Sequence, residues 1–351
     1  MITTTSRQHQ LRQHLPGGTT ARAANSIEHQ AALAARLTPR DKWLLALLYE
    51  HRVLTSTQMQ DAAFPSGRST RQRLRELYLW RAVSRFQPFR QLGSAPMHYV
   101  LGPAGAAVLA AEHGLEVKDL GYRHDRAMAI AHNQRLAHTV GVGDFFTSLI
   151  ARSRPDRRGA GLTAWWSETR CARHFGDLVI PDAYGRWAGA TGELEFFLEY
   201  DTGSESLTKV SRKLLAYARL ADSTGIATPV LFWLPTSRRE AGARAALARI
   251  HADLDQAADV PVATAATDLL SSTTRSPADE VWLPLDKRSS NRTSPRYSLG
   301  ELSHAWPALA ATSGLDEATG PPSDHAVAYR LPPPSPVPPE TTPGRTRRPG
   351  A

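Results

Sequence analysis

Apolar side chains recur at helical intervals early in the chain. Thr38 precedes Pro39, which suits an N-cap followed by the first residue of a helix. The apolar side chains that follow, three and four residues apart, are Trp43, Leu44, Leu47 and Leu48. This spacing places them on one face and predicts a helix that buries that face.

The elements that follow end in a β-hairpin. They are predicted as helices over 55–63 and 69–81, strands over 83–89 and 97–101 around a turn at 91–94, and a helix over 102–111. Thr55 suits the N-cap of the second helix. Three helices followed by a hairpin are the order of a winged helix-turn-helix domain, which we place at residues 36–118.

Positive charge is concentrated in this first block. The whole chain carries 42 Lys and Arg against 33 Asp and Glu, a net charge of +9. Residues 36–90 hold 11 basic and 4 acidic residues, so 11 − 4 = +7 of that charge lies there. The basic residues of the third helix and the hairpin are Arg68, Arg71, Arg73, Arg75, Arg85 and Arg90. We predict that they bind double-stranded DNA; a winged helix that contacts proteins, or a merely soluble basic face, is the alternative.

A second block has a different order of elements. It is predicted as a helix over 125–152, strands over 162–170, 177–187 and 194–201, a helix over 205–221, a strand over 228–234, a helix over 238–252 and a strand over 260–265. This order, αβββαβ with an extra helix and strand, predicts an α+β domain at residues 119–270.

The two ends of the chain have no sustained apolar pattern. We expect residues 1–35 to form a flexible arm. Residues 271–351 are rich in Pro, Ser and Arg, and 10 of the 25 prolines follow residue 320. Such a composition buries little apolar surface, so we expect a largely disordered tail with a short ordered piece around 281–285.

Composition excludes several classes of protein. The single cysteine, Cys171, rules out a disulfide scaffold and suits a reducing cytosol. A mean hydropathy of −0.36 without a long apolar run predicts neither a membrane span nor an export signal. The chain also lacks a Walker A sequence and the histidine pair of common relaxases, so ATP-driven unwinding and that type of strand transfer are not expected.

Three carboxylates in the second block could share one site. Asp182 lies in the second strand, and Glu199 and Asp201 lie two residues apart in the third, so both point to one face. The two strands are joined by a short link and could form a symmetric hairpin. The residue numbers of each facing pair would then add up to about 381, which places Asp182 opposite Glu199. Carboxylates that close repel each other unless a cation lies between them. We therefore predict Mg²⁺, which prefers oxygen ligands, held by Asp182, Glu199 and Asp201.

Two lysines follow these acids. Lys209 and Lys213 lie on one face of the next helix, and either could orient water or hold a phosphate beside the metal. Glu168 could be a further acidic ligand, and Asp177 is the alternative to Asp182, whereas His138 is interpreted as a buried structural histidine.

The second block resembles the PD-(D/E)XK nuclease superfamily. The resemblance depends on the order of the elements, on Pro181-Asp182 and on the carboxylates of the following strand. It implies phosphodiester hydrolysis with Mg²⁺ bound to these acids. The third strand has Asp201 where the superfamily usually has Lys, so the resemblance implies that Lys213 or Lys209 takes that role.

The whole pattern is similar to the replication-relaxation family of actinobacterial plasmids and mobile elements. The segments that carry this resemblance are 37–41 (LTPRD), 99–105 (YVLGPAG), 136–139 (LAHT), 181–187 (PDAYGRW) and 197–203 (FLEYDTG). The resemblance implies a role in plasmid replication or DNA processing, with replication or conjugation proteins as further partners.

Two functions remain open from the sequence. The first is a cytosolic DNA-binding protein with a Mg²⁺-dependent endonuclease or nickase domain. The second is a replication initiator or regulator whose nuclease-like domain is inactive. A transcription factor with a sensor domain is a third, weaker interpretation. The arrangement of Asp182, Glu199, Asp201 and the two lysines distinguishes the first from the second.

Overall fold

The computed structural model describes two compact units. Residues described are 11–12, 26–153, 160–189, 192–225, 227–254, 260–270, 276–285, 295–306 and 331–339. The first unit comprises residues 1–133 and 330–351, and the second comprises 134–329. In the part of the chain that is described, no helix has the length and apolar character needed to cross a bilayer.

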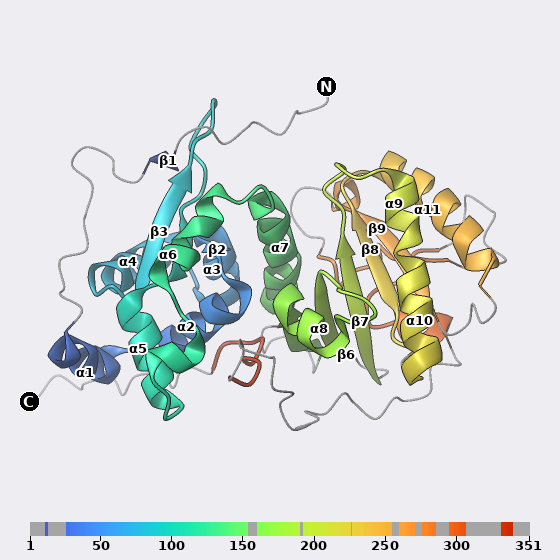
Figure 1. The fold of residues 1–351 in the computed structure, drawn as a ribbon. Coiled ribbons are helices and arrows are strands. Elements are labelled where there is room, and N and C mark those ends of the chain that lie inside the picture. Colours follow the sequence, from blue (N-terminus) through green and yellow to red (C-terminus); the bar gives the residue numbers. More distant parts are fainter. Residues whose placement is uncertain are drawn as a thin grey trace, which may run out of the picture. The chain divides into compact units, whose positions relative to one another are not determined.

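The first unit consists of helices around a small sheet (Figure 1). Its helices are α1 (Ile27–Arg36), α2 (Pro39–His51), α3 (Ser56–Ala63), α4 (Gly67–Leu79), α5 (Pro103–Glu112) and α6 (His124–Ala129). As the sequence predicts, Thr38 and Thr55 cap α2 and α3, each in a complete capping box. Leu44 and Leu47 of α2 and Leu74 and Leu77 of α4 are buried and form the centre of this core.

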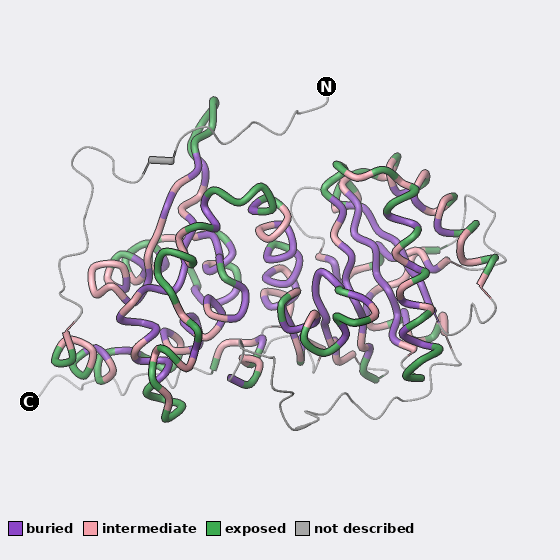
Figure 2. The backbone as a smooth tube through the Cα atoms, viewed as in Figure 1, coloured by how far each residue is buried: buried purple, intermediate pink, exposed green. Residues whose placement is uncertain are grey.

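Four strands make the sheet of the first unit. They are β1 (Leu11–Arg12), β2 (Leu54–Thr55), β3 (Val83–Pro88) and β4 (His98–Leu101), in the order β1-β3-β4-β2 with antiparallel neighbours. The β3–β4 hairpin predicted from the sequence is present. Its stem is buried at Phe86 and Tyr99, whereas the tip between the strands is exposed (Figure 2).

The second unit is built on a six-stranded mixed sheet. Its strands are β5 (Gly161–Ser167), β6 (Ala183–Gly189), β7 (Gly192–Tyr200), β8 (Val230–Leu234), β9 (Val262–Ala266) and β10 (Leu283–Pro284). The order is β10-β9-β8-β7-β6-β5. Strands β5, β6 and β7 run antiparallel to one another, β7, β8 and β9 run parallel, and β10 is antiparallel at the edge.

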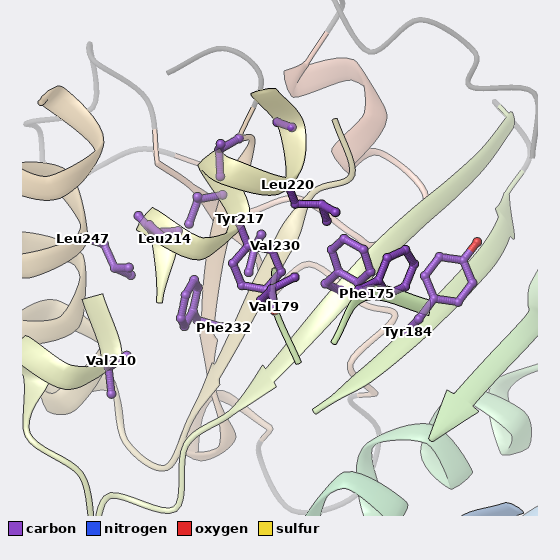
Figure 3. Packing of buried hydrophobic residues seen from close by; sticks show 14 of the residues in the cluster. Phe175, Val179, Tyr184, Val210, Leu214, Tyr217, Leu220, Val230, Phe232 and Leu247 are labelled. Carbon is purple, nitrogen blue, oxygen red and sulfur yellow. The ribbon is translucent and has the colours of Figure 1, made fainter. Parts of the chain in front are cut away.

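Helices cover both faces of this sheet. They are α7 (Leu136–Arg152), α8 (Glu168–Phe175), α9 (Leu207–Arg212), α10 (Leu214–Thr224) and α11 (Ser237–Ala252). On one face, Phe146 of α7 stacks on Trp165 and Phe196. On the other, Phe197 and Phe232 pack with side chains of α8 to α11 in one cluster (Figure 3). Because both faces are covered, a polar side chain inside the sheet needs a partner on a covering helix.

Three expectations from the sequence need correction in the folded core. The helix predicted over 125–152 is interrupted, because Asn133 adopts an extended backbone between the turn at Ile130–His132 and α7. Glu168 begins α8 and is not on a strand, because Ser167 caps that helix through the N–H of Arg170. The units divide after Asn133, later than the predicted boundary at 118–119.

Within the described residues, both terminal regions contain ordered segments; the rest of the predicted arm and tail lies outside the described residues. Helix α1 lies inside the predicted arm, capped by Ser26 and anchored by the buried Leu33. The ordered piece expected around 281–285 is present as β10. Residues 295–306 also fold, and the fully buried Leu299 and Leu302 tie them to the second unit. Isolated apolar residues of this kind form no periodic pattern, so hydrophobic periodicity does not predict these segments.

Candidate functional site

The predicted register between β6 and β7 is confirmed. Ala183 pairs with Leu198 and Gly189 with Gly192, so each pair sums to 381. Asp182 directly precedes β6, and its Oδ2 accepts a hydrogen bond from the backbone N–H of Tyr200 at 2.8 Å. The hairpin therefore brings Asp182 beside the end of β7, where Glu199 lies.

Glu199 is bound by two side chains of the helical layer. Lys213, at the junction of α9 and α10, forms an ion pair with its Oε2. The hydroxyl of Tyr217, which lies in the apolar cluster of Figure 3, donates to its Oε1 at 2.5 Å. Burial and the neighbouring charge of Asp182 outweigh these partners and raise the pKa of Glu199 to about 7.

Asp182 lies where both helical layers reach the end of the sheet. Nε2 of His138, on α7, is 3.1 Å from Oδ2 of Asp182, and Nζ of Lys213 is 4.0 Å from the same oxygen. Burial alone would raise the pKa of Asp182, but the hydrogen bond with His138 and the charge of Lys213 lower it. The same contact raises the pKa of His138, although burial opposes the shift.

Arg135 is an exposed arginine that lies beside Asp182. Nη2 of Arg135 is 3.8 Å from Oδ1 of Asp182, and its Nη1 donates to Glu168 at 2.8 Å. We call Asp182, Glu199, Lys213, His138 and Arg135 the acid–lysine cluster. Arg135 was not among the predicted site residues, and His138 was interpreted as a buried structural histidine. The only signal was their spacing of three residues, which places them on one helical face.

Two predicted site residues lie elsewhere. Asp201 is held by Arg239 of α11, whose Nη2 donates to its Oδ1 at 3.1 Å, and it also accepts from the N–H of Gly203 at 2.8 Å. Lys209 pairs with Glu205 on the exposed side of α9. The predicted site therefore divides: Asp182, Glu199 and Lys213 come together, whereas Asp201 and Lys209 form separate pairs.

The acids of the acid–lysine cluster are already paired with positive side chains, which does not favour a resident Mg²⁺ ion. Among the described residues, no group of three or more His, Cys, Asp or Glu side chains could hold a metal. The ammonium group of Lys213 lies between the carboxylates of Asp182 and Glu199, where a bridging cation would bind. With Arg135 beside them, the two acids already have as many fixed positive charges as negative ones. The sequence-based Mg²⁺ site remains a prediction that this arrangement does not favour.

The six arginines predicted to bind DNA fall into two groups. Arg68, Arg71 and Arg75 are exposed on α4, and Arg90 is exposed beyond the end of β3. Arg73 instead forms ion pairs with Asp41, at 2.5 Å, and with Glu76, at 2.6 Å. The guanidinium of Arg85 lies 4.1 Å from the ring centre of Tyr78. Arg73 and Arg85 therefore fix α4 against α2 and the hairpin, and Arg73 is not available to DNA.

Comparison with known proteins gives one match. A family model described as Replication-relaxation matches residues 45–231, which is 231 − 44 = 187 of the 351 residues. The matched range extends from α2 to β8 and includes α4, Asp182, Glu199 and Lys213. No curated protein and no solved structure matches the chain.

Proposed function

Because this chain belongs to the replication-relaxation family, we propose that it acts in plasmid replication by binding double-stranded DNA. The first unit is the DNA-binding part in this proposal. Its order of α2, β2, α3, α4, β3 and β4 supports a winged helix-turn-helix fold with α4 as the recognition helix and the β3–β4 hairpin as the wing.

The observation that carries the proposal is the arginine face of α4. We define this face as Arg68, Arg71 and Arg75, which follow one another at three- and four-residue spacing and so share one side of the helix. All three are exposed, and none has an ion-pair partner among the described residues. The seven-residue interval from Arg68 to Arg75 spans about 10 Å of helix, which fits within a major groove about 12 Å wide.

The sequence around this face is almost free of acids. Between Asp61 and Glu112 the only acidic residue is Glu76, against seven arginines. Glu76 pairs with Arg73, on another side of the helix from the arginine face. An unopposed positive surface attracts phosphate, and the release of counterions from DNA then supplies much of the binding free energy.

A binding assay with matched variants tests the proposal. The probe is a duplex of about 30 base pairs selected from a random pool by the wild-type protein. We expect Arg71→Ala with Arg75→Ala to bind at least tenfold more weakly, with a salt dependence reduced by about one counterion per lost phosphate contact. The control, Arg36→Ala with Arg126→Ala, removes the same charge from exposed positions of the same unit. Equal affinity of the two double variants would contradict the proposal.

For the second unit we propose a nuclease-like fold in which the charged side chains stabilise the structure and do not catalyse a reaction. Its α7, β5, β6, β7, α9–α10 and β8 follow the αβββαβ order, except that the short helix α8 lies between β5 and β6, and β8 is parallel to β7. This order and the pairing of Asp182 with the end of β7 favour a PD-(D/E)XK-like fold. In our proposal the acid–lysine cluster ties the strands to α7 and α10, and the unit serves replication without cutting DNA.

DNA cleavage is the second candidate function, because Asp182, Glu199 and Lys213 do lie together. Supercoiled plasmid incubated with the full-length protein and Mg²⁺ separates the two candidates. We expect the plasmid to stay supercoiled, since Lys213 already neutralises the acids. Nicking or linearisation that requires Mg²⁺ and is lost in Asp182→Asn would establish the nuclease in place of the binding-only protein.

A further inference from the structure

The tip of the β3–β4 hairpin combines exposed apolar side chains with an arginine. We call residues 89–94 the hairpin tip. Leu92 is 93% exposed and Phe89 is 38% exposed, and these are two of the five large hydrophobic side chains exposed in the described part of the chain. Arg90 lies between them in sequence and is also exposed. A partner that covers such an apolar side chain removes its surface from water, which contributes favourable free energy to binding.

The stem beneath the tip is well held. Nε2 of Gln87 donates to the carbonyl of Ala95 at 2.6 Å and closes the base of the loop. Gly93 has φ +71°, a left-handed conformation that lets the chain reverse directly after Leu92. Phe86 stacks on His98 across the stem, with ring centres 5.2 Å apart. These contacts hold the turn that carries the exposed Leu92.

The stem that carries the tip is joined to α4. Arg85 of β3 stacks on Tyr78 of α4, so hairpin and helix are joined by a direct contact. From Ala82 to Leu101 the hairpin contains no acidic residue, which makes its charge complementary to DNA. Binding to a hydrophobic protein surface would not need the positive charge of the hairpin. Binding to a membrane would not need a neighbouring helix that fits the major groove of DNA.

We propose that the hairpin tip inserts Leu92 into the minor groove as a wedge between base pairs and bends the DNA. The proposal rests on the DNA-binding function given above. Leucine and phenylalanine side chains that enter a base step partly unstack it and kink the duplex toward the major groove. Arg90 would hold the adjacent phosphates, and Phe89 would cover the sugar edge behind Leu92. A bent duplex would also contact more of the surface of the first unit than a straight duplex would.

Energy transfer between dyes at the two ends of the selected duplex tests the wedge, because bending shortens the distance between them. The variants are Leu92→Ser, the apolar replacement Leu92→Met, and Ile27→Ser as control, since Ile27 is 80% exposed on α1. We expect Leu92→Ser to abolish the bend and weaken binding about tenfold with an unchanged salt dependence, because an apolar contact releases no counterions. Leu92→Met and Ile27→Ser should bend DNA as the wild type does.

The outcomes separate the wedge from the proposed function. Wild-type protein that binds the duplex without bending it, or Leu92→Ser protein that bends it fully, would overturn the wedge and leave DNA binding in place. Failure of the wild type to bind any duplex would overturn DNA binding itself. Loss of the bend in both Leu92→Ser and Ile27→Ser would show a general effect of lost apolar surface and would also overturn the wedge.

Discussion

Lys213 is the residue on which the acid–lysine cluster depends. It forms an ion pair with Glu199, whose side chain is 3% exposed, and lies 4.0 Å from Asp182. Removing one partner of a buried pair leaves an uncompensated charge, which costs about 3–5 kcal/mol. We therefore expect Lys213→Met to lower the free energy of unfolding of the second unit by about that amount in urea denaturation.

Lys209 provides a matched control for this prediction. It pairs with Glu205 in the same region, but its side chain is 68% exposed. Exposed pairs of this kind contribute about 0–1 kcal/mol, so Lys209→Met should change stability little. Equal effects of the two variants would mean that Lys213 does not compensate the buried acids. A wild-type protein whose melting temperature rises on adding Mg²⁺ would likewise contradict our interpretation of the cluster.

His138 makes the stability of the second unit depend on pH. Its contact with Asp182 raises the pKa of the imidazole above its ordinary value of 6.5. A raised pKa in the folded state means that the contribution is fully present below pH 6.5 and is lost as the pH rises through the folded-state value. The stability advantage of the wild type over His138→Gln should therefore shrink as the pH rises above 6.5. Unfolding curves across this range measure it, and His113→Gln, at an exposed position, should follow the wild type.

At the scale of elements, Arg296 holds the segment that follows β9. It donates to Glu240 of α11 from two nitrogens, at 3.0 and 2.7 Å, and to the carbonyl of Val281 at 2.5 Å. Glu240 is 2% exposed, so its charge needs this partner. We expect Arg296→Met to destabilise the second unit by about 3–5 kcal/mol and to speed amide hydrogen exchange in residues 276–285.

Arg152 gives the control for the same segment. It pairs with Asp279 at 2.8 Å, and its side chain is 38% exposed. Arg152→Met should therefore cost no more than about 1 kcal/mol. If amide exchange over 276–285 rises as much in Arg152→Met as in Arg296→Met, the buried Glu240 pair is not what holds the segment.

Short-range sequence patterns predicted the helices and strands better than they predicted which side chains pair across the fold. The caps at Thr38 and Thr55 and the register of β6 with β7 follow from short-range patterns, and all three are present. The pairing of Asp201 with Arg239 spans 38 residues and depends on how α11 crosses the sheet. Sequence spacing carries no such information, because periodicity shows only which face a residue occupies.

The arginines show the same limit within a single helix. Arg71, Arg73 and Arg75 are equivalent in sequence, yet Arg73 faces Asp41 of α2 and is bound there. Which of them remains exposed depends on the packing of two helices, a tertiary property. The short apolar anchors Leu33 and Leu299 were missed for a related reason, since one buried residue in a polar segment leaves no pattern.

At the scale of the whole molecule, a segment near the C-terminus packs against the first unit. In the proline-rich segment 331–339, Leu331 and Pro336 are buried, and the carbonyl of Ser335 accepts from Nε1 of Trp43 at 2.7 Å. Deleting residues 331–351 would uncover the Trp43 indole and remove the acceptor of its N–H. Each loss costs about 1–3 kcal/mol, so the first unit should melt at a lower temperature.

Calorimetry of the full-length protein and its variants can assign this effect to one unit. Two compact units with separate cores should give two transitions, and Arg296→Met should lower only the one that belongs to the second unit. Deleting 331–351 should lower only the other, whereas deleting 340–351, which leaves the docked segment intact, should lower neither. A shift of both transitions on removal of 331–351 would show that the segment stabilises more than the unit it contacts through Trp43.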